Sequence, residues 1–236
     1  CQCLREYLKP SLSHSCSLIL SQKYVIFNTC VIFSPQGTIL AKHRKLHLFD
    51  INIPGKMVFK ESDSLTPGNH LTTFSIPTSY LFPQGLPTFP VHLGTFPTQF
   101  TIGVGICYDI RFSVDALYAR SHFNTDMLVY PGAFNMTTGP AHWQLLQQAR
   151  ALDTQSYVAT CSPARSSGVT DSDCIDQKIG KTYTYTAWGH SSVISPWGEV
   201  DATTEHQSDV VISNIDIERL YTIRQNIPIS QQQRPD

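Results

Sequence analysis

The chain has 236 residues and a formal net charge of -1, with 15% charged and 41% hydrophobic residues. Its charged fraction is low beside the roughly 25% of an ordinary soluble protein. The near-neutral balance excludes a strongly basic surface for nucleic acid or an anionic membrane, and the hydrophobic content excludes a disordered chain. No apolar run reaches the roughly 18 residues of a membrane span, and the length fits one large domain covering residues 1–236.

The seven cysteines are dispersed, with no Cys-x-x-Cys pair and no Cys/His cluster at zinc spacing. This usage predicts free thiols in a reducing compartment. We therefore expect a cytoplasmic protein, with a mitochondrial form as the alternative. His43 and His47 lie four residues apart but lack the intervening Glu of a metalloprotease motif, so we expect no metal.

Strands and helices are predicted to alternate along the chain, which is typical of an α/β fold. Residues 24–33 and 38–43 are rich in β-branched and aromatic side chains and are joined by Ser34-Pro35-Gln36-Gly37, a pattern that predicts a hairpin. The later elements expected are a strand at 101–106, a helix at 113–120, a strand at 126–130, a helix at 139–153, strands at 157–161, 191–195 and 210–215, and a last helix capped by Asp216.

Two stretches interrupt this alternation. Residues 79–100 carry four prolines among aromatic residues, a composition that suits neither a helix nor a central strand. Residues 166–186 are polar and contain two glycines. Both stretches are predicted to be surface insertions, exposed and poorly packed, although long loops of this kind can also be functional lids.

Cys107 is the first candidate for chemistry because it lies at a predicted strand-to-helix turn. Such a turn can expose the side chain while the next backbone N–H, that of Tyr108, faces the same space as half of an oxyanion hole. A thiolate is a good nucleophile where a base or cation makes it available. The alternative is a small buried hydrophobic residue at a strand end.

Lys45 is the second candidate, in a stretch that alternates basic and apolar residues after a predicted strand. A lysine there could lower the pKa of a thiol and stabilise developing negative charge, or it could be a solvated strand end. Glu61, taken by itself, would be a surface carboxylate.

Six motifs make these residues recognisable as a set. They are KLHLFD at 45–50, PGK at 54–56, GICYDIRF at 105–112, YPGAF at 130–134, TGPAHW at 138–143 and WGHS at 188–191. In order and spacing the chain resembles the nitrilase (carbon–nitrogen hydrolase) superfamily over residues 24–78, 101–165 and 187–234. The resemblance lapses at the two interrupting stretches.

The resemblance implies an α-β-β-α sandwich of the nitrilase type and a homodimer that needs no cofactor. It implies that Cys107 is the nucleophile, that Lys45 stabilises the tetrahedral intermediate, and that Glu61 is a supporting second glutamate. Arg111 is near enough in sequence to bind a substrate carboxylate, and an equally open alternative is a structural role for Asp109 with Arg111.

The family also carries a general-base glutamate, early in an apolar strand that ends in Pro-Glu. The only acidic residue before Lys45 is Glu6, whose surroundings match neither feature. Residues 1–23 look unlike the family, so Glu6 is not carried over. We expect a chain truncated at its N-terminus, without the first strand, first helix and base.

The best-matching branch hydrolyses the terminal amide of 2-oxo dicarboxylic acid monoamides such as 2-oxoglutaramate and 2-oxosuccinamate. A small-molecule amide is therefore the expected substrate, with activity impaired by loss of the base. Two alternatives remain open, which are hydrolysis of deaminated glutathione by a neighbouring branch and a non-catalytic truncated chain.

Overall fold

The computed structural model describes most of the chain. The described residues are 2–8, 25–54, 57–82, 84–85, 90–165, 173–176, 181–184 and 186–234. Most of the atypical segment 1–23 lies outside these ranges, as do residues 166–172, 177–180 and 185 of the second interrupting stretch.

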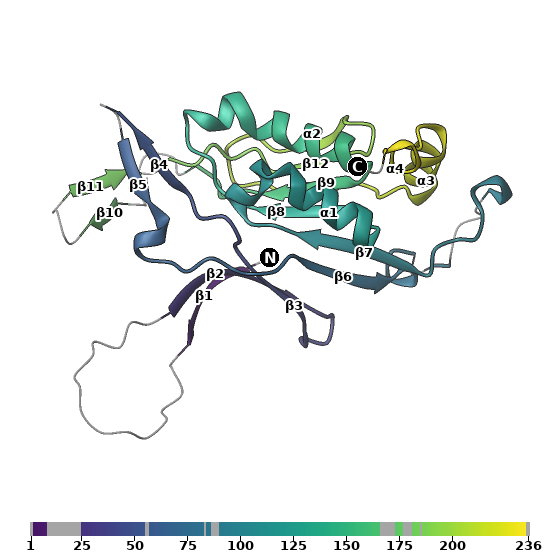
Figure 1. Ribbon diagram of the computed structural model, residues 1–236, viewed down its shortest axis with the longest axis horizontal. Helices are drawn as coiled ribbons and strands as arrows, with labels where there is room; N and C mark the ends of the chain where they lie inside the picture. Colours follow the sequence, from purple (N-terminus) through teal and green to yellow (C-terminus); the bar gives the residue numbers. More distant parts are fainter. Residues whose placement is uncertain are drawn as a thin grey trace, which may run out of the picture.

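A six-stranded sheet forms the centre of the molecule (Figure 1). Its strand order is β13 (Val200–Thr203), β12 (Ser192–Ile194), β9 (Tyr157–Cys161), β8 (Met127–Pro131), β7 (Gln99–Val104) and β6 (Thr72–Pro77). β7, β8 and β9 are parallel, and the outer strands join them antiparallel. The carboxyl ends of three parallel strands therefore meet at one edge.

A second sheet contains β1 (Gln2–Leu8), β2 (Val25–Phe33) and β3 (Ile39–Arg44), all antiparallel. The predicted hairpin is confirmed as β2 and β3. Its turn is closed by the Gly37 N–H, which donates to the Ser34 carbonyl at 2.9 Å. Gly37 has φ of +82°, a conformation that a side chain would strain.

The two sheets pack against each other through a small apolar cluster. Cys30 of β2 is buried with Val104 and Ile106, which lie at the end of β7, and Phe74 of β6 packs beside them. Figure 1 shows β1, β2 and β3 beneath β6 and β7. This contact places the end of β3 close to the end of β7.

The two longest helices cover the other face of the central sheet. They are α1 (Ser113–Phe123) and α2 (Gln144–Thr154), and residues of both join the largest core cluster with Leu128 and Val158. The helix predicted from residue 139 is confirmed, except that Gly139–Trp143 forms a π-helical turn before α2. The described residues thus give three layers, helices on a six-stranded sheet on a three-stranded sheet.

The C-terminal part contains α3 (Ile217–Asn226) and α4 (Ile229–Gln232). Asp216 caps α3 as predicted, since its side chain accepts from the Arg219 N–H at 2.9 Å. The strand predicted at 210–215 is wrong. Val210 and Ile212 are 77% and 84% exposed, and no strand of the described chain pairs with them, so their β propensity has no sheet to join.

The proline-rich stretch 79–100 is better packed than its composition suggested. Phe100 is the second residue of β7 and is 2% exposed. The rings of Phe82 and Phe96 meet edge to face at 5.8 Å and pack against the same cluster as Phe100 and Leu220. The stretch also holds η3 (Val91–Leu93), after η2 (Thr78–Tyr80). The expectation of poor packing is wrong for these side chains, and the expectation of an insertion stays a prediction.

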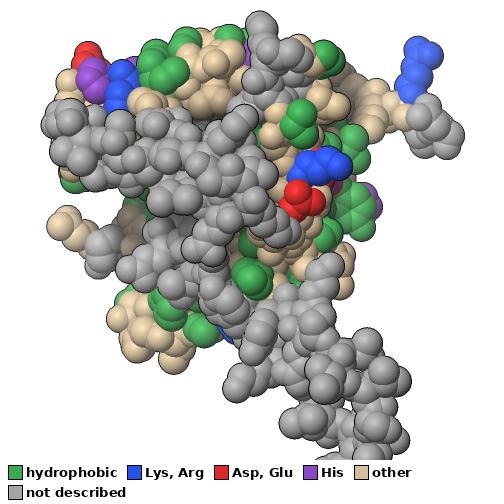
Figure 2. Space-filling model, turned by 90° about the vertical axis from the view of Figure 1, so that its left-hand side faces the viewer, with side chains coloured by type: hydrophobic (Ala, Val, Ile, Leu, Met, Phe, Trp, Pro, Cys, Tyr) green, Lys and Arg blue, Asp and Glu red, His purple; other side chains and the backbone are tan. Residues whose placement is uncertain are grey.

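Two short hairpins complete the described chain. β10 (Asp173–Asp176) pairs with β11 (Lys181–Thr184) inside the second interrupting stretch, and β4 (Asp50–Ile53) pairs with β5 (Met57–Lys60) before the 3₁₀ turn Glu61–Asp63. Figure 2 shows the face on which these hairpins lie, where the coloured side chains include few charged ones among the hydrophobic ones, in keeping with the sparse charge of the sequence.

Candidate active site

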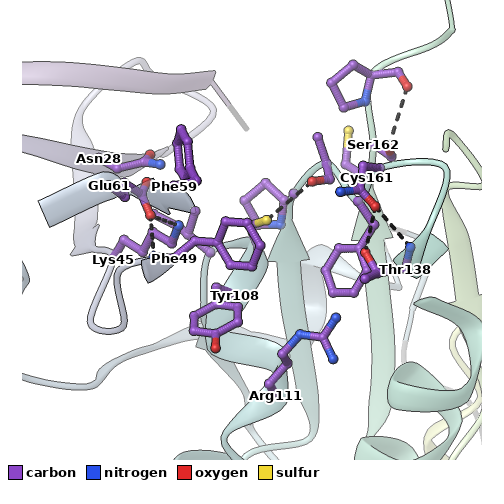
Figure 3. A pocket seen from close by; sticks show the side chains of 18 residues that line it. Asn28, Lys45, Phe49, Phe59, Glu61, Tyr108, Arg111, Thr138, Cys161 and Ser162 are labelled. Carbon is purple, nitrogen blue, oxygen red and sulfur yellow. Dashed lines mark hydrogen bonds and ion pairs between the residues drawn. The ribbon is translucent and has the colours of Figure 1, made fainter. Parts of the chain in front are cut away.

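A pocket of about 510 Å³ opens where the carboxyl ends of β7, β8 and β9 meet the loops after β3 and β5. In Figure 3, Lys45 and Glu61 lie on one side of this pocket, Tyr108 and Arg111 below it, and Thr138, Cys161 and Ser162 on the other side. The lining is largely apolar. Cys107, Lys45, Glu61 and Tyr108, predicted from sequence as site residues, all line it.

Cys107 is held in an uncommon backbone conformation. It follows β7 by three residues, begins the 3₁₀ turn Cys107–Arg111, and has φ of +50°, in the left-handed region. A residue other than glycine costs about 1–3 kcal/mol in such a conformation. Gly132 allows it to fit, because a Cβ on Gly132 would lie 2.6 Å from the Cys107 Cα. The YPGAF motif therefore has a steric role beside the nucleophile candidate.

The Cys107 thiol keeps its proton to a higher pH than a free thiol does. Burial raises its pKa, and the nearby Lys45 ammonium and a hydrogen bond with the Ala133 backbone only partly offset that effect. The Sγ–H donates to the Ala133 carbonyl at 3.5 Å. A thiol in this state needs a base to become a nucleophile at neutral pH.

Lys45 and Glu61 form a buried pair. The Lys45 side chain is 4% exposed, and its Nζ donates to Glu61 Oε2 at 2.5 Å. The same carboxylate oxygen accepts from the Phe49 N–H at 2.7 Å. Glu61 thereby fixes where the ammonium lies.

Tyr108 offers a backbone donor beside the thiol. As the second residue of the 3₁₀ turn, it is among the first N–H groups of a helix, which have no intrahelical acceptor. Its ring stands edge to face on Phe49 at 5.0 Å. The residue is thus fixed against the loop that carries Lys45.

The contacts around Asp109 were not predicted from the sequence. This carboxylate is 3% exposed and accepts hydrogen bonds from His43 Nε2 at 3.2 Å and from His47 Nδ1 at 3.0 Å. The sequence-based alternative of an Asp109–Arg111 pair is not what forms. The Arg111 guanidinium instead lies over the Phe134 ring at 4.8 Å, at the pocket wall.

In the part of the chain that the structure describes, no three His, Cys, Asp or Glu side chains are grouped so as to hold a metal ion. Among the same residues, no helix has both the length and the apolar character needed to cross a membrane.

Solved structures of similar shape identify the fold class. Nit3 of Saccharomyces cerevisiae, a member of branch 10 of the nitrilase superfamily, is 33% identical, has a TM-score of 0.65, and is matched over 89% of this chain and 61% of its own. The NitFhit protein of C. elegans is 28% identical with a TM-score of 0.65, over 89% of this chain and 42% of its own. The fold is therefore of the nitrilase type.

The family model for carbon-nitrogen hydrolases matches residues 11–225, and the chain belongs to this family. Omega-amidase NIT2 of Xenopus tropicalis is 48% identical over 212 residues, 89% of this chain and 63% of its own length. The human omega-amidase NIT2 is 46% identical over the same shares. The chain thus spans 63% of the length of these relatives.

Proposed function

We propose that the chain carries the active site of an omega-amidase, which hydrolyses the terminal amide of 2-oxoglutaramate or 2-oxosuccinamate to the 2-oxo acid and ammonia. The observation that carries the proposal is that Cys107, Lys45 and Glu61 line the same pocket. The relatives named omega-amidase support the choice of substrate.

The chemistry would be acyl transfer through a thioester. Cys107 Sγ attacks the amide carbon after losing its proton, and the carbonyl oxygen becomes an oxyanion. Lys45 Nζ and the Tyr108 N–H stabilise that oxyanion, each contributing about 3 kcal/mol. The C–N bond then breaks and the nitrogen leaves as ammonia with the proton taken from the thiol. Water finally hydrolyses the thioester and releases the 2-oxo acid.

Arg111 is the proposed partner of the substrate carboxylate. Arg111 lines the pocket and, unlike Lys45, does not pair with Glu61. Its Nη2 lies 3.3 Å from His142 Nδ1. Partial burial lowers the pKa of Arg111, yet arginine stays charged at neutral pH. A planar guanidinium can bind a carboxylate through two parallel hydrogen bonds.

The general base is the part of the site that the described residues do not supply. Glu61 is the one carboxylate among the described residues that line the pocket, and it already holds Lys45. Glu6 pairs in register with Phe27, one position along from the pocket residue Asn28.

We therefore predict slow turnover by the 236-residue chain. A missing general base lowers the rate by on the order of 10² to 10⁴. Adding a segment that supplies the family's Pro-Glu strand should restore the rate, and Glu6→Gln in the present chain should change nothing. Fast turnover that Glu6→Gln abolishes would contradict the assignment.

Ammonia release from 2-oxoglutaramate tests the function itself. The extended chain should release ammonia, and Cys107→Ala should abolish the release, whereas Cys161→Ala, at the far wall of the same pocket, should retain it. Deaminated glutathione is the comparison substrate. Faster turnover of that substrate would favour the neighbouring branch, and no turnover of either substrate would favour a non-catalytic chain.

The resemblance also supports a homodimer, which we propose forms through the outer helices. Val114 and Leu117 of α1 and Leu145 of α2 are exposed apolar residues on these helices, at 73%, 43% and 64%. Leu145→Glu should shift the sedimentation coefficient of the chain to that of a monomer, while Ile212→Glu, a similarly exposed site outside the helices, should leave it unchanged. A parent chain that sediments as a monomer would contradict the proposal.

A cytoplasmic location, with a mitochondrial form as the alternative, also stays a prediction. Fractionation of cells that express the tagged protein tests it.

A further inference from the structure

Asp109 is the most heavily hydrogen-bonded carboxylate among the described residues around the pocket. Its Oδ2 accepts from the Ile106 N–H at 2.9 Å, from His43 Nε2 at 3.2 Å and from the Leu46 N–H at 3.4 Å. Its Oδ1 accepts from the His47 N–H at 2.8 Å and from His47 Nδ1 at 3.0 Å. Two carboxylate oxygens thus serve five donors.

These donors come from two separate segments. Ile106 immediately precedes Cys107 in the turn that exposes the thiol, whereas Leu46 and His47 immediately follow Lys45 in the loop after β3. The two segments are about sixty residues apart in the sequence. One buried side chain therefore joins the backbone beside the thiol to the backbone beside the ammonium.

We infer that Asp109 is a positioning residue, which holds the Cys107 turn and the Lys45 loop in register so that the ammonium stays beside the thiol. The inference rests on the proposed roles of Cys107 and Lys45. Asp109 itself does not line the pocket, so it acts through its neighbours and has no contact with substrate.

The surroundings of Asp109 make the arrangement stiff. His43 is fully buried and its Nδ1 lies 3.1 Å from Thr72 Oγ1 of β6, so the imidazole ties Asp109 to the central sheet. The His47 ring stacks on Phe112 at 3.5 Å, and its Nδ1 also lies 3.4 Å from Asp115 Oδ2. Asparagine at position 109 would replace one carboxylate oxygen by an amide NH₂ group. That group is a donor, so it would face N–H groups that now donate to the oxygen.

The charges around Cys107 distinguish a positioning role of Asp109 from a purely electrostatic one, because the two roles predict opposite changes in thiolate formation when Asp109 is substituted. Lys45 favours the thiolate, whereas Glu61 and Asp109 disfavour it, and the Arg111 guanidinium is the remaining nearby cation. Removing the charge of Asp109 with every position unchanged would therefore increase thiolate formation. Loosening Lys45 from the thiol would decrease it.

The rate of alkylation of Cys107 by iodoacetamide distinguishes these outcomes, since only the thiolate reacts. The rate is measured from pH 6 to pH 10 on the peptide that contains Cys107, in the folded chain. Asp109→Asn should slow alkylation at pH 7.5 by about tenfold or more, the change that one pKa unit produces below the midpoint. An unchanged or faster rate in folded Asp109→Asn would overturn the inference.

Asp126→Asn is the matched control. Asp126 is also buried and accepts from the Thr101 N–H and from Arg224, but neither partner adjoins Cys107 or Lys45 in the chain. This variant should lose stability and keep the alkylation rate of the parent. An equal slowing in both variants would show that general loosening is the cause, and would overturn the inference.

His47→Phe covers the case in which Asp109→Asn does not fold. It keeps a ring on Phe112 and removes one donor to Asp109, so we expect a smaller slowing in the same direction, and a parent-like rate would overturn the inference. Alkylation needs no amide hydrolysis. Absence of ammonia release would therefore count against the proposed function while leaving this test decisive.

Discussion

The two edges of the parallel strands β7, β8 and β9 use buried carboxylates differently. At the amino edge, Asp126 pairs with Arg224 at 2.8 Å and accepts from the Thr101 N–H at 2.9 Å. At the carboxyl edge, Asp109 is surrounded by imidazoles and backbone N–H groups, and no arginine or lysine of the described chain donates to it. The ion pair at the amino edge lies away from the pocket, whereas the Lys45–Glu61 pair and Arg111 at the carboxyl edge line it.

The central sheet therefore has a stabilising ion pair at one edge and the candidate catalytic groups at the opposite edge. Arg224 also donates to the carbonyls of Thr125 at 2.7 Å and Gln155 at 3.0 Å, so it joins α3 to the starts of β8 and β9. Its contacts lie outside the pocket lining. We expect substitutions at the amino edge to act on folding and those at the carboxyl edge to act on the thiol.

Arg224→Met should produce the largest loss of stability. It would leave Asp126 buried without its cation, and breaking a buried pair in this way costs about 3–5 kcal/mol. Urea unfolding measures the loss, and alkylation of Cys107 in the folded variant should match the parent. A loss below about 1 kcal/mol, as for an exposed ion pair, would remove the distinction between the edges.

Gly132→Ala should have the next largest effect, and at the opposite edge. The added Cβ would lie 2.6 Å from the Cys107 Cα, so the turn must move, with a loss of about 1–3 kcal/mol and a lower alkylation rate of Cys107. Gly37→Ala is the matched control. Its Cβ would meet nothing within 4 Å, so its positive φ costs stability while alkylation stays unchanged. Equal alkylation rates in both variants would contradict the steric role of Gly132.

Phe82→Ala should cost about 2 kcal/mol, because the half-buried ring packs with Phe96 over the amino edge. Ile212→Ala, at a side chain that is 84% exposed, should change the free energy of unfolding by no more than about 0.5 kcal/mol. Thermal unfolding compares the two. Equal effects would show that the proline-rich stretch contributes as little as its composition first suggested.

The smallest expected effect is a difference in acid stability. Burial would raise the pKa of Asp109, but hydrogen bonds from His43, Ile106 and His47 outweigh it and hold the pKa below its ordinary value. The carboxylate therefore stabilises the fold above its unfolded-state pKa of about 3.9, and the contribution is lost as pH falls through the lower folded-state pKa. Between about pH 4 and pH 2, stability should fall less steeply in Asp109→Asn than in the parent. Identical slopes would contradict this role.

Local patterns in the sequence predicted the elements that have local causes. The β2–β3 hairpin follows from its turn, and the α3 cap follows from one side chain, Asp216. The failed strand at 210–215 has the right composition but no neighbouring strand, which a local pattern does not encode. The packing of Phe82 on α3 residues was missed for the same reason.

The site was predictable where a motif holds it and not where distant contacts do. The resemblance placed Cys107, Lys45 and Glu61 in one site, and the structure lines one pocket with them. The contacts of Asp109 with His43 and His47 join residues more than sixty positions apart, and they depend on how β3 packs beside β7. The spacing of residues in the sequence does not encode such a long-range contact.

The most direct test of the proposed nucleophile is mass spectrometry of the chain extended by the Pro-Glu segment, quenched in acid during its reaction with 2-oxoglutaramate. If Cys107 is the nucleophile and Lys45 stabilises the oxyanion, the peptide that contains Cys107 should carry the acyl group as a thioester, and Lys45→Met should lose that adduct. Acylation of Cys161 in place of Cys107, or ammonia release that persists in Cys107→Ala, would contradict the account.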